Sequence, residues 1–127
     1  MYKLFLIGLG GFVGTLLRYG FSGLVQNWSK SVTFPYGTLA VNLLGCMVIG
    51  FLSQLVESYG IFSSETRGFV LIGLLGAFTT YSTFANETAN LARDGQGALS
   101  LANMGLHLFL GLAAVWLGRV IVNSVWR

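Results

Sequence analysis

The sequence predicts an all-α membrane protein in which four transmembrane helices form a single domain over residues 1–127. Hydrophobic residues make up 54% of the chain and charged residues only 9%, whereas about 25% of the residues in typical soluble proteins are charged. So few charges cannot cover the surface of a soluble fold, but a lipid bilayer suits such a surface. The chain contains four long, mainly uncharged segments, each close to the ~20 residues that a helix needs to cross a bilayer.

The four segments are expected to form helices at about residues 4–25, 37–56, 68–92 and 98–121. We expect helices rather than strands because each segment must satisfy its own backbone hydrogen bonds in lipid. The first helix must accommodate Arg18, the second starts after the only proline, Pro35, and the fourth contains His107. Because the connections are short and polar, they predict an up-down-up-down bundle with both termini on one side.

Glycine is abundant inside the predicted helices, with 18 glycines in the chain. Gly10 and Gly14 form a G-x-x-x-G pair in the first helix. In a membrane, such small residues let two helix backbones approach closely. We expect further notches of this kind in the other helices at Gly45, Gly73, Gly76, Gly105 and Gly111.

The basic residues are scattered and nearly balanced between the two predicted sides of the membrane. The side with the termini carries Lys3, Arg67, Arg119 and Arg127, and the opposite side carries Lys30 and Arg93. This excess is weak for the positive-inside rule. The charges are equally compatible with insertion in both orientations, as in an antiparallel homodimer, and with one slightly biased orientation. No basic cluster tracks a phosphate backbone, so no nucleic acid partner is expected.

The third helix contains the most unusual segment of the chain, Gly-Ala-Phe-Thr-Thr-Tyr-Ser-Thr-Phe at residues 76–84. Threonine is a modest helix former, and Ser and Thr hydroxyls compete for backbone hydrogen bonds. The segment therefore predicts a local break in the helix, in a place covered by protein or by a polar cavity. Carbonyl groups that are freed at such a break can bind a cation.

Three polar or aromatic residues near this break have two interpretations each. Tyr81 and Phe84 are three residues apart, so their rings share a helix face, and ring edges carry positive partial charge that can stabilise a small anion. Packing against a neighbouring helix is the commoner use of such a pair. Asn42, one turn after Thr38 in the second helix, either donates to an anion or joins two helices through its amide.

Charged residues within the helices are few. Arg18 either extends to the interface or lines an aqueous vestibule. Glu87 either edges the opposite vestibule or is a charge at a helix end. No carboxylate lies in the middle of a helix, which argues against a proton-coupled exporter of cationic drugs. No nucleophile, base and orienting group can be assembled, so the chain is not expected to be an enzyme.

Several motifs in order resemble the Fluc (CrcB) fluoride channels of bacteria over essentially the whole chain. Gly-Gly-Phe-Val-Gly at residues 10–14 leads to Arg18-Tyr19, and Gly37-Thr38-Leu39 is followed by Val41-Asn42. The segment 76–84 matches the family's third-helix signature, and Glu87 follows it. One position departs from the family, because Tyr81 stands where phenylalanine is usual.

The resemblance implies a passive, fluoride-selective channel without an organic cofactor, which exports cytoplasmic fluoride across the bacterial inner membrane and reduces its toxicity. It implies an antiparallel, dual-topology homodimer surrounded by lipid, with two pores along the subunit interface. Tyr81 and Phe84 would form an aromatic box beside Asn42, and the backbone carbonyls of Gly76 and Thr79 from both subunits would hold a structural sodium ion. The polar track of the pore would be formed by Thr38, Ser82 and Thr83, and Arg18 would match the family's basic residue. A small dual-topology multidrug exporter and a purely structural helix-packing subunit are the alternatives.

Overall fold

The computed structural model describes residues 1–126, so the predicted charge at Arg127 lies outside the described residues. These residues contain helices and no β-strand. In chain order the helical elements are α1 (Tyr2–Ser29), α2 (Tyr36–Tyr59), α3 (Ser64–Arg67), η1 (Gly68–Leu75), α4 (Gly76–Phe78), α5 (Tyr81–Arg93), α6 (Gly97–Gly105), η2 (Leu106–Leu110) and α7 (Gly111–Val125). The η elements are π-helical turns.

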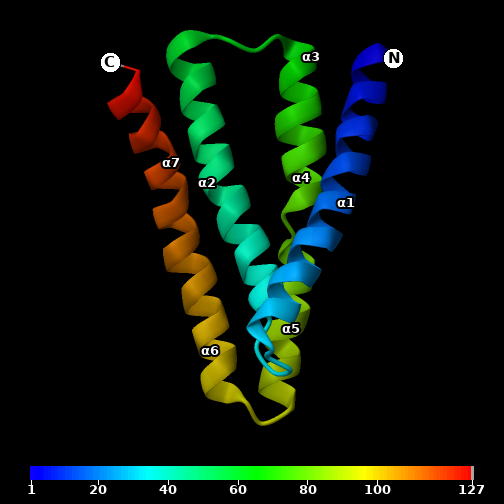
Figure 1. Ribbon diagram of the computed structural model, residues 1–127, viewed down its shortest axis with the longest axis vertical. Coiled ribbons are helices and arrows are strands. Elements are labelled where there is room, and N and C mark those ends of the chain that lie inside the picture. Colours follow the sequence, from blue (N-terminus) through cyan, green and yellow to red (C-terminus); the bar gives the residue numbers. More distant parts are fainter. Residues whose placement is uncertain (127) are drawn as a thin grey trace.

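The elements join into four spans that are long and apolar enough to cross a membrane. The first two spans are the single helices α1 and α2, whereas the third covers Ser64–Arg93 and the fourth covers Gly97–Val125. Each span is longer by a few residues than the helix expected from the sequence. The spans run alternately up and down, and the N-terminus and the C-terminal end lie at the same end of the molecule (Figure 1). The predicted all-α, four-span architecture is therefore confirmed.

The spans pack as two pairs. α2 lies along α7, and α1 lies along η1 and α4. The two pairs splay apart toward the end with the termini and converge at the opposite end, where α5 and α6 are joined by a short turn (Figure 1). Most of the close packing in the bundle is therefore between the two spans of each pair.

Glycines bring both pairs into backbone contact. A Cβ atom at Gly10 would collide with the carbonyl oxygen of Phe69, and one at Gly14 with that of Leu74. The predicted G-x-x-x-G contact is therefore confirmed as an α1–η1 interface. Gly50 and Gly118, which the sequence did not single out, have the same role between α2 and α7.

The other predicted notches differ from one another. Gly73 also lies against the backbone of α1, and Gly45 lies against the methyl group of Thr79. A Cβ atom at Gly76 or Gly111 would make only ordinary contacts, at 3.8 and 3.7 Å. A Cβ atom at Gly105 would have no neighbour within 4 Å among the described residues, so the prediction of a notch there is wrong for this chain. Spacing alone does not say which side of a helix faces a neighbour.

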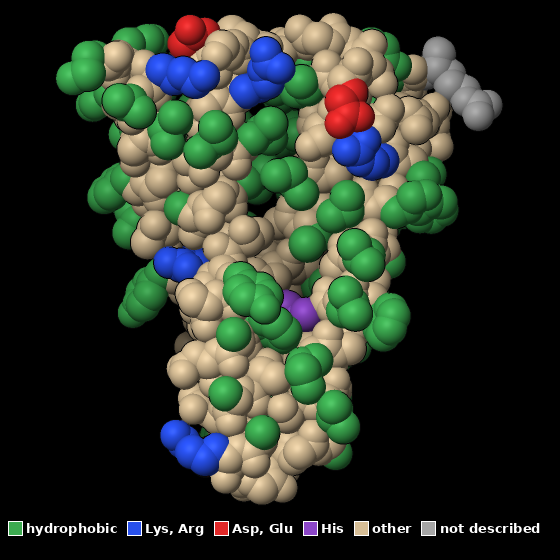
Figure 2. All heavy atoms as spheres, turned by 180° about the vertical axis from the view of Figure 1, so that it is seen from behind, with side chains coloured by type: hydrophobic (Ala, Val, Ile, Leu, Met, Phe, Trp, Pro, Cys, Tyr) green, Lys and Arg blue, Asp and Glu red, His purple; other side chains and the backbone are tan. Residues whose placement is uncertain are grey.

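Hydrophobic side chains are spread along the spans, and the charged side chains lie near the two ends apart from a basic side chain at mid-height (Figure 2). Large side chains such as Phe5, Phe12 and Trp116 are more than 60% exposed. At the end with the termini, Arg119 forms a two-pronged ion pair with Glu57, with nitrogen–oxygen distances of 2.8 and 3.1 Å, which joins α7 to α2. This distribution of apolar and charged groups matches a bilayer core with two polar interfaces.

Candidate functional site

The candidate site is centred on a break in the third span at Thr79 and Thr80. Both residues have extended backbone, with φ/ψ of −85°/156° and −150°/114°, and they separate α4 from α5. The break lies within the hydroxyl-rich segment in which the sequence predicts one. Lipid supplies no hydrogen-bond partner for backbone groups released in this way, so other protein groups must supply them.

The side-chain amide of Asn42 replaces the missing helical hydrogen bonds. The Thr80 N–H donates to Asn42 Oδ1 at 2.8 Å, and Asn42 Nδ2 donates to the Thr80 carbonyl at 3.0 Å. This reciprocal pair ties α2 to the break. Of the two interpretations of Asn42, the joining of helices is therefore realised in the single chain.

The first turn of α5 is capped by a side chain of the break itself. The Thr83 N–H donates to Thr80 Oγ1 at 3.3 Å, and Thr80 Oγ1 donates to Thr83 Oγ1 at 2.9 Å. In an uninterrupted helix, the N–H groups of Thr80 and Thr83 would bond the carbonyls of Gly76 and Thr79. Because these N–H groups are engaged elsewhere, the two predicted cation-binding carbonyls lose their helical partners.

His107 in η2 connects the same amide to the fourth span. Its Nε2 atom lies 3.0 Å from Asn42 Nδ2, and its Nδ1 atom lies 3.0 Å from the backbone oxygen of Asn103. A carbonyl oxygen only accepts, so Nδ1 carries the ring proton and Nε2 accepts from Asn42. The imidazole ring also lies on the Phe84 ring, with centroids 4.1 Å apart and planes 38° apart.

A buried polar network extends from His107 along the α5–α6 contact. Thr88 Oγ1 donates to the Phe84 carbonyl at 2.7 Å, Asn103 Nδ2 donates to Thr88 Oγ1 at 2.9 Å, and Ser100 Oγ donates to the Thr88 carbonyl at 2.9 Å. Asn103 is fully buried. Sequence reasoning assigned no site role to Thr88 or to the three residues of the fourth span, although Ser100, Asn103 and His107 have the spacing of one helix face.

The aromatic pair lies beside this network on a concave surface. The rings of Tyr81 and Phe84 have centroids 5.6 Å apart and planes 58° apart. They border a hollow of about 530 Å³, which Asn42, Thr79 and His107 also line. Gly76 lines the same hollow. The structure thus brings the predicted box, amide and cation-binding residues together on one face, where Tyr81 is 80% exposed.

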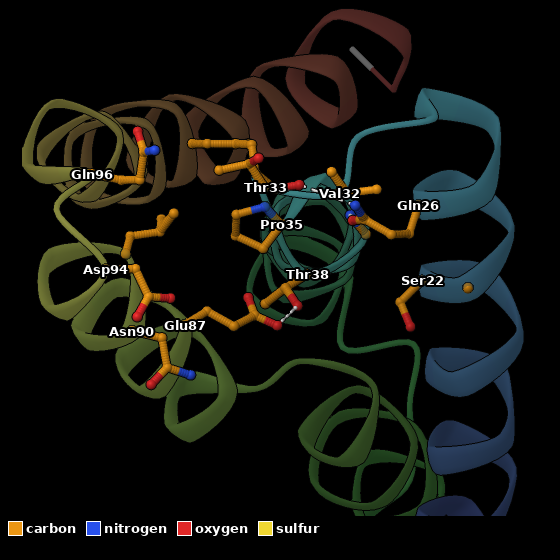
Figure 3. A pocket seen from close by; sticks show the side chains of 14 residues that line it. Ser22, Gln26, Val32, Thr33, Pro35, Thr38, Glu87, Asn90, Asp94 and Gln96 are labelled. Carbon is orange, nitrogen blue, oxygen red and sulfur yellow. Dashed lines mark hydrogen bonds between the residues drawn. The ribbon is translucent and has the colours of Figure 1, made fainter.

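Thr38 and Glu87 lie in a second hollow of about 600 Å³, between the start of α2, α5 and the end of α1 (Figure 3). Thr38 Oγ1 donates to Glu87 Oε1 at 2.8 Å. The far rim carries the carboxylate of Asp94 and the amides of Asn90 and Gln96 (Figure 3). Thr38 and Glu87 therefore form a polar contact toward the end that holds the α1–α2 and α5–α6 connections.

Arg18 is half-buried beside a smaller cavity of about 260 Å³, which Thr38, Thr80 and Thr83 also line. Because Thr38 borders this cavity and the hollow of Glu87, the two charged groups lie in the same half of the chain. The assignment of Arg18 and Glu87 to vestibules stays a prediction. Ser82 is exposed and lines none of these three hollows.

Comparison with known proteins identifies the family. Residues 5–119 match the family model described as "CrcB-like protein, Camphor Resistance (CrcB)". The chain belongs to the CrcB family. It is 42% identical to the Fluoride-specific ion channel FluC 3 of Methanosarcina barkeri, covering 98% of this chain and 93% of the relative. It is also 45% identical to the Fluoride-specific ion channel FluC 1 of Methanosarcina acetivorans, covering 94% of this chain and 90% of the relative.

A third relative, the Fluoride-specific ion channel FluC of Desulforapulum autotrophicum, is 44% identical over 94% of this chain and 95% of its own length. The resemblance inferred from the motifs is thus confirmed. With four spans that can cross a bilayer, this CrcB-family chain is a multi-pass membrane protein. Its relatives are named as ion channels, which do not form a class of enzymes.

The buried network predicts a large effect of a small change at Thr88. Thr88→Val keeps the shape of the side chain but leaves Asn103 Nδ2 without its acceptor, so we expect a loss of about 1–3 kcal/mol in the free energy of unfolding. Equilibrium unfolding in mixed micelles measures it. The control is Ser124→Ala, because Ser124 makes the same kind of bond to the carbonyl four residues earlier, at 2.9 Å, on an exposed face. That change should stay within about 0.5 kcal/mol, and equal effects would contradict the role assigned to Thr88.

Proposed function

We propose that this chain forms a fluoride-selective, passive channel through which cytoplasmic fluoride leaves the cell, which reduces fluoride toxicity. The observation that carries the proposal is the cluster at the break, where the paired rings of Tyr81 and Phe84 line the same hollow as Asn42. The same arrangement of residues lies in a chain that is 42–45% identical to proteins named as fluoride-specific ion channels.

The chemistry of the cluster suits a small anion. Amide N–H groups and ring edges carry positive partial charge without a formal charge. Such a pathway binds an anion weakly enough to release it, and a narrow pathway favours an ion that makes strong hydrogen bonds. Hydrogen fluoride crosses membranes as the neutral acid and dissociates in a more alkaline cytoplasm. A passive anion pathway in the cytoplasmic membrane, the inner membrane of a bacterium with two membranes, then lets the trapped anion leave.

We further propose that the channel is an antiparallel homodimer in which the second copy covers the concave surface. Tyr81 is 80% exposed there although it belongs to the proposed pathway, so the pathway of one chain is open on one side. The nearly balanced basic residues at the two ends are compatible with insertion in both orientations. A second copy of opposite orientation would close the pathway and place two breaks near each other.

The carbonyls of Gly76 and Thr79 fit a structural sodium ion, because the N–H groups that would bond them in a helix are engaged by Asn42 and by Thr80. Carbonyl oxygens at unwound membrane helices coordinate sodium. A bound sodium ion would neutralise the partial charges of these oxygens and hold the two breaks together. These two carbonyls of each chain would be its ligands.

Sodium binding is expected to raise the melting temperature of the purified protein with the logarithm of the sodium concentration, because a ligand that binds only the folded state stabilises it. Thermal unfolding in detergent measures the effect, with sodium replaced by N-methylglucamine at equal ionic strength. A melting temperature that does not depend on sodium would remove the site from the proposal.

Liposomes that contain the purified protein and fluoride are expected to release fluoride rapidly and to retain chloride. Ion-selective electrodes measure both ions, and protein-free liposomes correct for the leak of hydrogen fluoride. Equal fluxes of the two anions would overturn the selectivity. Absence of any ion flux would favour a purely structural subunit, and proton-dependent uptake of a cationic dye would favour the exporter.

Two substitutions in the aromatic pair sharpen this test. Phe84→Ile removes the ring edge and its contact with His107, so fluoride efflux should collapse to the protein-free rate. Tyr81→Phe keeps the ring edge and should retain conduction. Loss of flux in the Tyr81 variant would show instead that the hydroxyl itself is required.

Dual topology is expected to leave each end of the chain on both sides of the membrane. In a Cys46→Ala background, which has no other cysteine, Val32→Cys and Ile61→Cys place single thiols in exposed loops at opposite ends. A membrane-impermeant maleimide applied to intact cells should label about half of each variant. Complete labelling of one variant and none of the other would show a single orientation.

A further inference from the structure

We propose that His107 is the residue that sets anion specificity at Asn42, because its ring nitrogen competes with the anion for an amide hydrogen. The inference rests on the proposed function, since it names the determinant of selectivity within the same pathway. It is carried by four contacts of His107 and Asn42, which involve α2, the break, α6 and η2.

Both amide hydrogens of Asn42 are already used in the chain. One is donated to the Thr80 carbonyl at 3.0 Å and the other to His107 Nε2 at 3.0 Å. The contact with Thr80 is reciprocal, because the Thr80 N–H also donates to Asn42 Oδ1 at 2.8 Å. Breaking it would release two backbone groups of the break, whereas the contact with His107 is a single hydrogen bond. The hydrogen that faces His107 is therefore the one that an arriving anion takes.

The imidazole is held in the orientation that makes this competition possible. Its Nδ1–H donates to the backbone oxygen of Asn103 at 3.0 Å, which leaves Nε2 as the acceptor. The Phe84 ring lies against one side of the imidazole with a centroid distance of 4.1 Å. The ring cannot turn Nε2 away from Asn42 without losing the hydrogen bond to Asn103.

An anion that binds Asn42 must then break one hydrogen bond and leave Nε2 unpaired. No proton is transferred, because the hydrogen stays on the amide nitrogen and only its acceptor changes. A half-buried acceptor without a partner carries a free-energy penalty. The penalty itself is the same for either anion, so it changes the ratio of their fluxes by limiting one flux and not the other. Fluoride accepts hydrogen bonds much more strongly than chloride and binds in spite of the penalty, so a later step limits its flux, whereas the penalty limits the entry of chloride. The hydrogen bond between Asn42 and His107 thus gives selectivity by opposing chloride, and it adds no attraction for fluoride.

The described residues that line the hollow are uncharged, so hydrogen bonding decides between fluoride and chloride. Among the described residues that line the hollow around Asn42 and His107, none is Asp, Glu, Lys or Arg. A fixed positive charge nearby would attract both halides and weaken their discrimination, and a carboxylate would repel both. With neutral donors alone, the difference between the two anions lies in the strength of the bond that each makes in place of His107.

Three substitutions separate the acceptor from the ring. His107→Phe keeps an aromatic ring against Phe84 and removes the acceptor, and His107→Leu removes both. His107→Gln removes the ring but offers a carbonyl oxygen as acceptor. In liposomes, the rate of chloride efflux relative to fluoride efflux should rise about 3- to 10-fold in the Phe and Leu variants, as expected for the net strength of one hydrogen bond. The Gln variant should keep the ratio of the unsubstituted protein.

Each other result overturns the inference. An unchanged ratio in the Phe and Leu variants would show that Nε2 does not compete, and an equal rise in all three would show that the ring acts by packing. If the Phe and Leu variants fail to give monodisperse protein while the Gln variant folds, the bond to Asn42 is structural only. Absence of fluoride efflux from the unsubstituted protein would instead overturn the proposed function, so the two failures are distinguishable.

Discussion

The structure depends on the inability of lipid to form hydrogen bonds with backbone groups. A break in a membrane span releases N–H and C=O groups that each carry a free-energy penalty of several kcal/mol without a partner. In this chain the Asn42 amide supplies both partners of Thr80, at 2.8 and 3.0 Å. The break can therefore exist only where α2 lies beside the third span, and this requirement links the local conformation of Thr79 and Thr80 to the packing of the bundle.

The same bonds that satisfy the break also place the groups of the proposed pathway. Asn42 contacts His107, His107 contacts Asn103, and Asn103 contacts Thr88, whose hydroxyl returns to the Phe84 carbonyl. This path closes through the Phe84–His107 ring contact. Stability and the arrangement of the pathway are thus properties of one network, and a substitution in it affects both. The π-helical turn that carries His107 agrees with the tendency of such turns to occur at functional sites.

The surface of the single chain has an open hollow between its two pairs of spans. Close backbone contacts at glycines make two tight pairs of spans, α1 with η1 and α2 with α7. Between them the chain leaves a hollow of about 530 Å³ bordered by the break and by the two aromatic rings. Of these two rings, that of Tyr81 is the more exposed, although Tyr81 lines the proposed anion pathway. A second copy that covers this face would close the open side of the proposed pathway.

The sequence by itself determined the four spans, their alternating directions, the glycine contact at Gly10 and Gly14, the location of the break and the family. Each of these features follows from the length and composition that one segment needs in lipid, or from a motif within one segment. It can therefore be predicted without knowledge of the other segments. Only the tertiary structure decided that the amide of Asn42 is fully engaged, that His107 is its second partner, and that Arg18 and Glu87 lie in the same half. The choice of hydrogen-bond partners depends on the rotation of each helix about its axis, which close packing against neighbouring helices determines.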